Sequence, residues 1–169
     1  TLEAYAAELK VDRVLPFRFI AAAQAVPQLE PMLESLMFKC LGDAQTLKGR
    51  TCLLVDISGS MTSELSAKSD MRRTDAAYGL AVLLREIAEE VDIYSFSENA
   101  KLVAPRHGFA LRDAINSSQE HGGTYLAIAL GQIKLQNYDR VIVITDEQSA
   151  DGIGKLPLEV KGYVINVAS

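Results

Sequence analysis

The sequence predicts an α/β fold, a doubly wound and mostly parallel sheet with helices on both faces, preceded by a short helical extension. After about residue 49, short continuous apolar runs alternate with longer helical stretches, and such runs are typical of strands covered on both faces. Before that point, apolar residues recur at helical spacing. We therefore expect residues 1–47 to form the extension and residues 48–169 to form the α/β domain.

The extension is expected to contain two helices. Residues 16–23 form the first, with Pro16 in its first turn, where a proline is tolerated. Residues 27–38 form the second, which carries an apolar stripe and ends near Gly42.

Strands and helices then alternate in the α/β domain. Thr74 is the expected N-cap of the helix that follows the first strand, and the negative charge of Asp75 is favourable in the first turn of that helix. The expected strands are residues 51–57, 91–96, 101–104, 140–145 and 162–167, and the expected helices are residues 74–90, 109–115 and 124–135.

Composition excludes several classes of protein. The chain has 169 residues, of which 49% are hydrophobic and 23% are charged, as in a globular domain with a real core. Its net charge of -5 excludes a broadly basic surface, so any contact with RNA or DNA must be local. No apolar run approaches a membrane span, and we expect no membrane association. Cys40 and Cys52 are expected to be reduced, with a disulfide between them as the alternative, which favours the cytoplasm.

Polar side chains cluster where two predicted strands end. The first strand runs into Asp56-Ile57-Ser58-Gly59-Ser60, where Asp56, Ser58 and Ser60 recur at every second residue and so point the same way in extended backbone. Gly59 would allow a turn that brings them together. A later strand ends at Asp146, and the Gly122-Gly123 turn presents Thr124. Ligands of such sheets bind at the carboxyl ends of the strands, so we expect these side chains to converge.

Two carboxylates and three hydroxyls make a set of hard oxygen ligands. This set suits Mg²⁺, with Mn²⁺ or Ca²⁺ as substitutes, and the lack of Cys and His argues against zinc or copper. Hydroxyl oxygens donate weakly, so the metal should stay electrophilic toward an outside carboxylate or phosphate. That favours binding through a metal bridge over hydrolysis. The alternative is a turn with side-chain caps and no metal.

These residues resemble a known motif. Asp56-Ile57-Ser58-Gly59-Ser60, then Thr124 after Gly-Gly, then Thr145-Asp146 are similar to the metal-ion-dependent adhesion site of a von Willebrand factor type A domain, over roughly residues 49–169. The resemblance implies that the metal shell consists of Asp56, Ser58, Ser60, Thr124 and Asp146, some of them acting through water.

The N-terminal part resembles the Ro autoantigen family. The resemblance is carried by Leu15-Pro16-Phe17-Arg18-Phe19, by the helix through Leu33-Glu34-Ser35-Leu36, and by Lys48-Gly49-Arg50-Thr51. Members of that family join a ring of helical repeats, the TROVE module, to an A domain and bind small non-coding RNAs, chiefly through the ring. The resemblance implies that residues 1–47 end such a module and that the full-length protein binds RNA. Because most of the ring and the C-terminal helix of an A domain are missing, we expect a fragment.

Five further residues are candidate partner contacts, each with a less specific alternative. A phosphate or an acidic partner could meet Lys68, Arg72 and Arg73, which otherwise form a solvated segment. His121 either touches a ligand or makes a local hydrogen bond. Tyr125 either stacks on a base or packs into the start of a helix.

Three functions follow from these residues. The favoured one is a non-enzymatic, metal-dependent binding module of a Ro-like RNA-binding protein, with the metal bridging to an acidic group of a protein or RNA. The alternative is a metal-dependent protein-binding A domain unrelated to RNA. A metal-assisted phosphoryl-transfer enzyme with Asp56 as nucleophile is less favoured, because Ser58 stands where an assisting acid is often placed and no phosphate-binding GxxxxGK occurs.

Overall fold

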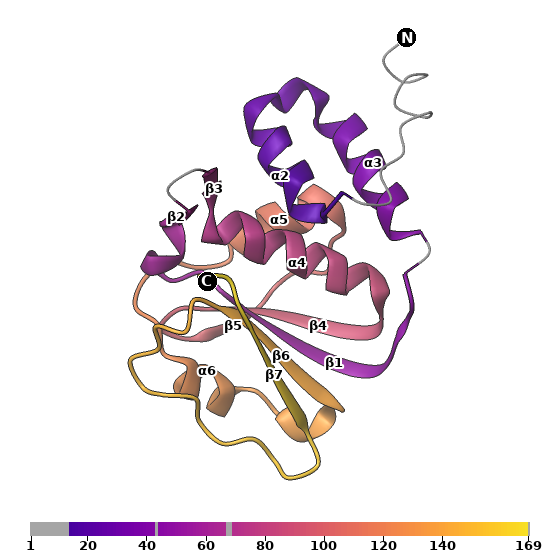
Figure 1. The fold of residues 1–169 in the computed structure, drawn as a ribbon. Helices are drawn as coiled ribbons and strands as arrows, with labels where there is room; N and C mark the ends of the chain where they lie inside the picture. Colours follow the sequence, from indigo (N-terminus) through magenta and orange to yellow (C-terminus); the bar gives the residue numbers. More distant parts are fainter. Residues whose placement is uncertain (1–13, 43, 67–68, 169) are drawn as a thin grey trace.

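The computed structural model describes residues 14–42, 44–66 and 69–168, and it shows a five-stranded sheet between layers of helices (Figure 1). The strand order is β5-β4-β1-β6-β7, in which β4, β1, β6 and β7 are parallel and β5 runs antiparallel to β4. The strands are β1 (Leu47–Asp56), β4 (Ala88–Phe96), β5 (Ala100–Leu102), β6 (Arg140–Thr145) and β7 (Lys161–Asn166). The predicted α/β fold with a mostly parallel sheet and an N-terminal helical part is confirmed.

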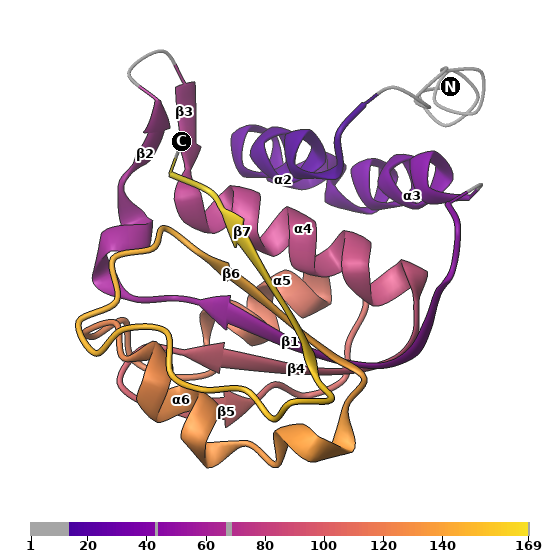
Figure 2. The same cartoon turned by 60° about the horizontal axis from the view of Figure 1, so that its bottom comes forward.

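The helices cover both faces of this sheet (Figures 1 and 2). One face carries α4 (Arg73–Ile87) and α5 (Gly108–Asn116), with α2 (Pro16–Ala25) and α3 (Glu30–Leu41) stacked outside them. The other face carries α6 (Leu126–Gln132). Short 3-10 turns occur at η1 (Pro27–Leu29), η2 (Gly59–Thr62) and η3 (Leu135–Asn137).

Alternation along β1 explains why this strand is buried on both sides. Leu53 and Val55 belong to the core beneath α4, whereas Cys52 and Leu54 belong to the core beneath α6. All four are fully buried, as a central parallel strand requires. Cys52 is therefore a buried apolar residue, and neither it nor Cys40 is in a disulfide.

The N-terminal helices share the core of the α/β part. Ile20 in α2 and Met37 in α3 are fully buried in the same cluster as Val55. Helix α2 approaches α4 closely at Gly79, where an added Cβ would lie 2.6 Å from the Cβ of Phe17. The predicted boundary between residues 47 and 48 coincides with the start of β1, but a division of the chain into two domains there stays a prediction.

Several predicted elements differ from the structure at their ends. The predicted helix over residues 124–135 is shorter, because Tyr125 donates its backbone N–H to Ser97 O before α6 begins. The predicted helix over residues 74–90 begins at Arg73 and ends at Ile87, since the chain then continues directly into β4.

An antiparallel hairpin that was not expected from the sequence, β2 (Glu64–Ser66) and β3 (Ser69–Arg72), leads into α4 (Figure 2). In the described ranges, no helix has the length and apolar character needed to cross a membrane.

Candidate functional site

The candidate site lies where β1 and β6 end side by side. Val55 pairs with Ile144 in the parallel ladder, so the next residues of both strands emerge at the same edge of the sheet. Thr145 donates its hydroxyl to Asp56 Oδ2 at 2.6 Å, which ties the two strand ends together. Asp56 and Asp146 are both buried, with exposures of 0% and 4%.

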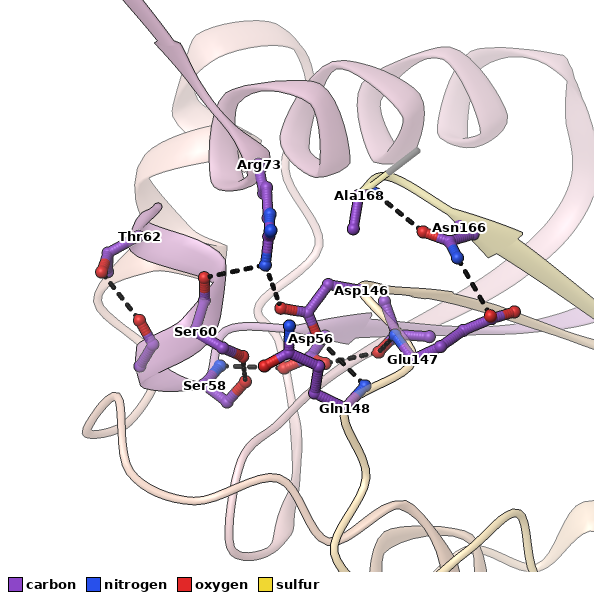
Figure 3. A network of polar contacts seen from close by, with 12 residues as sticks. Asp56, Ser58, Ser60, Thr62, Arg73, Asp146, Glu147, Gln148, Asn166 and Ala168 are labelled. Atoms are coloured by element: carbon purple, nitrogen blue, oxygen red, sulfur yellow. Dashed lines mark hydrogen bonds and ion pairs between the residues drawn. The ribbon is translucent and has the colours of Figure 1, made fainter. Parts of the chain in front are cut away.

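The loop after β1 folds around the Asp56 carboxylate. Asp56 Oδ1 accepts the backbone N–H of Ser58 at 2.9 Å, and the Ser58 and Ser60 hydroxyl oxygens lie 3.2 Å apart (Figure 3). The turn that brings them together does not need a glycine at position 59. Gly59 is outside the left-handed region, and an added Cβ would meet nothing nearer than 3.6 Å.

Thr124 lies on an adjoining loop. Gly59 donates its N–H to Gly122 O at 2.9 Å, so the first loop contacts the turn that precedes Thr124. Thr124 is 7% exposed, and its carbonyl accepts the N–H of Ala150 at 2.8 Å. Among the described residues, no hydrogen bond joins the Thr124 side chain to Asp56 or Asp146. The structure thus gathers four of the five predicted ligands closely, and Thr124 follows two residues after the glycine that contacts their loop.

Electrostatics at this edge disfavour a charged Asp56. Burial raises the pKa of the Asp56 carboxyl, and the negative charge of Asp146 adds to the rise. Hydrogen bonds from Thr145 and Ser58 act in the opposite direction without cancelling it.

Arg73 is the cation at the site. It is the first residue of α4, and its Nη1 donates to Asp146 Oδ2 at 2.9 Å and to Ser60 O at 3.5 Å (Figure 3). The Asp146 side chain is 0% exposed and that of Arg73 is 19% exposed. Arg73 was expected to contact a partner, whereas in the structure it pairs with Asp146, a predicted metal ligand. None of the ion pairs seen in the described part of the chain involves Asp56.

The start of α4 explains how Arg73 reaches this position. The N-cap is Arg72, not Thr74 as predicted, and Asp75 accepts the Arg72 N–H at 2.8 Å. The Arg73 N–H donates to Ser63 O at 3.0 Å, which fastens the helix start to the end of the loop after β1.

The other predicted partner contacts lie elsewhere or make local contacts. Arg72 is exposed and lines a polar cleft of ≈ 470 Å³ with residues of α2, α4 and α5. His121 Nε2 lies 3.0 Å from Asn116 O, the local hydrogen bond that was its alternative role. The Tyr125 ring packs against Gly123, where an added Cβ would lie 2.8 Å from it. Lys68 lies outside the described residues.

The donor set fits a hard divalent cation. The site holds two buried carboxylates and one guanidinium, which pairs with Asp146, so one negative charge is uncompensated when both carboxyls are ionised. In residues 14–42, 44–66 and 69–168, no three His, Cys, Asp or Glu side chains form a metal-binding cluster. A metal here would therefore depend on hydroxyl oxygens and water in addition to the two carboxylates.

A comparison with known proteins shows that this fold occurs in a solved structure. No protein-family model and no curated protein matches the chain. The crystal structure of the RO (RSR) protein of Deinococcus radiodurans superposes with a TM-score of 0.60 and 24% identity, over 87% of this chain and 34% of that chain. The fold is shared with a Ro protein. The chain thus spans about a third of that protein's length, and the likeness shows the fold alone.

Two further structures are similar over a smaller part of the chain. One is an aerotolerance-related membrane protein from Bacteroides fragilis, with 20% identity and a TM-score of 0.48 over 62% of this chain and 57% of that chain. The other is the conserved hypothetical protein BatB from Bacteroides thetaiotaomicron, with 20% identity and a TM-score of 0.46 over the same shares.

Proposed function

We propose that this chain is a non-enzymatic binding module in which Mg²⁺, or Mn²⁺ or Ca²⁺ in its place, bridges to an acidic group of a partner. The observation that supports the proposal most is the pair of buried carboxylates, Asp56 and Asp146, at the ends of adjacent parallel strands. A buried carboxylate ion without a cation is costly, and a divalent ion between the two would offset both charges.

The remaining ligands would be hydroxyls. Ser58 and Ser60 lie beside Asp56, and Thr124 lies on the loop that accepts a hydrogen bond from Gly59 between them. When bound, the metal supplies a Lewis-acid site for a carboxylate or phosphate oxygen. The chain's own residues hold that site where β1 and β6 end, and they keep Asp56 away from solvent.

Two observations favour binding over catalysis. Ser58, not an acid, stands two residues after Asp56. His121, a candidate base next to the Gly122-Gly123 turn, bonds to the backbone of Asn116. An enzyme would need a positioned acid or base within reach of the reacting group.

Calorimetry with Mg²⁺ and Mn²⁺ tests the metal. We expect the wild type to bind and Asp56→Asn to lose binding at least about tenfold, because one of two anionic ligands is removed. Glu147→Gln is the matched control: this acid adjoins Asp146 but bonds to Asn166 instead of pointing into the set. Equal heats for wild type and Asp56→Asn would remove the metal from the proposal.

RNA association is the finer part of the proposal, and the shared fold with a Ro protein favours it over a purely protein partner. With a net charge of -5, this chain by itself should bind RNA weakly. We expect small RNAs with single-stranded ends to be retained by a longer form that includes a helical module, and retention to fall as salt rises. Retention of acidic proteins but of no RNA by that form would favour the protein-binding alternative.

A further inference from the structure

We propose that Arg73 is the resident cation of the metal-free protein: it pairs with Asp146 at the candidate metal site, and a divalent ion binds only by displacing it. The inference rests on the proposed metal binding. It adds a residue outside the predicted ligand set that controls how tightly the metal binds.

The first step is the position of the guanidinium. Arg73 Nη1 lies 2.9 Å from Asp146 Oδ2 and 3.5 Å from the backbone oxygen of Ser60. Both residues belong to the predicted shell, so Arg73 lies between two of its members, as Figure 3 shows. The partner carboxylate is fully buried, so solvent screens this ion pair little.

Arg73 and a divalent ion would compete for the Asp146 carboxylate. The guanidinium of an arginine carries a fixed positive charge, so Arg73 gives up Asp146 only by moving its side chain away. Bound on the same carboxylate, it would repel a divalent ion at short range in a poorly screened setting. The arginine and the metal therefore exclude each other from Asp146.

The third step is that Arg73 is held incompletely. A guanidinium carries five N–H donors, but the hydrogen bonds at this site come from Nη1 alone. Its Nε is buried and has no partner in the described structure. Since an unpaired buried donor is unfavourable, leaving the site relieves that penalty while breaking the bond to Asp146. The side chain is 19% exposed, so it has a route to solvent.

The test compares the metal affinity of charge-removing variants by calorimetry with Mg²⁺ and Mn²⁺. We expect Arg73→Gln to bind at least about tenfold more tightly than wild type, because the competing charge is gone. Lys101→Gln is the matched control, an exposed cation on β5 at the same edge of the sheet, and it should change the affinity by less than about twofold. Arg73→Lys keeps the charge and should remain much closer to wild type than Arg73→Gln.

Thermal unfolding gives a second readout. In EDTA, Arg73→Gln should unfold at a lower temperature than wild type, since Asp146 loses its cation, and added Mg²⁺ should raise its Tm more than that of wild type. Equal or weaker metal binding by Arg73→Gln would overturn the inference while leaving the metal site intact. Absence of binding in wild type and in every variant would overturn the proposed function and this inference together.

Discussion

At the scale of single residues, the ion pair between Arg73 and Asp146 matters most, because it joins residues 73 positions apart in a buried setting. Removing one partner of such a pair leaves the other charge buried without compensation, which costs far more than the intact pair contributes. Pairs with an exposed carboxylate behave differently, because water solvates and screens that charge.

This contrast gives the first prediction. In the absence of metal, Asp146→Asn should lower the free energy of unfolding by about 2–4 kcal/mol, because Arg73 is left without its carboxylate. Urea unfolding measures it. Asp113→Asn is the control, because the carboxylate that it removes from the ion pair with Arg112 is 66% exposed, and it should cost less than about 1 kcal/mol. Similar losses in both variants would contradict the view that the Asp146 pair is poorly screened.

At the scale of elements, α2 can pack closely on α4 because Gly79 of α4 has no side chain. An added Cβ at Gly79 would lie 2.6 Å from Phe17 Cβ and 2.7 Å from Phe17 Cα, and the latter is backbone that cannot rotate away. Glycine weakens a helix by about 1 kcal/mol relative to alanine, so its presence in the middle of α4 indicates a packing requirement.

The second prediction concerns this glycine. Gly79→Ala should destabilise the protein by about 1–3 kcal/mol despite the better helix former, because α2 must move away from α4. Gly131→Ala in α6 is the control, since an added Cβ there meets nothing within 4 Å, and it should be neutral or stabilising by up to about 1 kcal/mol. Chemical denaturation of both variants measures the difference, and a stabilised Gly79→Ala would show that the close approach is not required.

Helix α6 receives its N-terminal cap from a distant residue. The Asp151 carboxylate accepts the N–H groups of Ala127 and Ile128 at 3.1 and 2.8 Å. Burial pushes the pKa of Asp151 upward, but the hydrogen bonds from Ile128, Ser149 and Ala127 outweigh it and hold the pKa below its usual value.

The third prediction follows from the sign of this shift. A carboxyl with a lowered pKa in the folded state stabilises the protein at pH values above its unfolded-state pKa, and this contribution is lost as pH falls through the folded-state pKa. Stability should therefore fall below about pH 4 in the wild type and fall less steeply in Asp151→Asn. Thermal unfolding from pH 6 to pH 3 measures both slopes. Parallel pH profiles would show that the cap carries no such linkage.

At the scale of the whole molecule, the N-terminal helices and the sheet form one core. Ile20 of α2 is fully buried in the cluster that also contains Val55 of β1 and Ile144 of β6. A core shared in this way predicts a single cooperative unfolding transition.

The fourth prediction tests whether the N-terminal helices and the sheet unfold together. Ile20→Ala should cost about 2–4 kcal/mol and should lower the protection of β1 amides from hydrogen exchange by the same free energy, because both belong to one cooperative unit. Leu15→Ala, at a position 54% exposed, is the control and should have little effect. If β1 protection is unchanged in Ile20→Ala, the helices unfold separately from the sheet.

Much of this architecture could be predicted from the sequence, because its signals are local. The apolar run before Asp56 indicates a central strand, and parallel strands bring their carboxyl ends to one edge, which places Asp56 near Asp146. The role of Arg73 could not be predicted, because it depends on the hairpin before α4 and on which helix residue is the N-cap. The cap on α6 was missed for a similar reason, since Asp151 lies beyond a whole strand.

The geometry of α4 has one more consequence. Arg73 begins this helix, and Gly79, where α2 packs, lies six residues further along, or about 9 Å along the axis. Helix α4 thus carries both Arg73, which we propose to compete with the metal for Asp146, and Gly79, where α2 packs. If metal binding at the candidate site shifts α4, a partner that binds the N-terminal helices will change the affinity for the divalent ion. The ion will then change the affinity for that partner by the same factor.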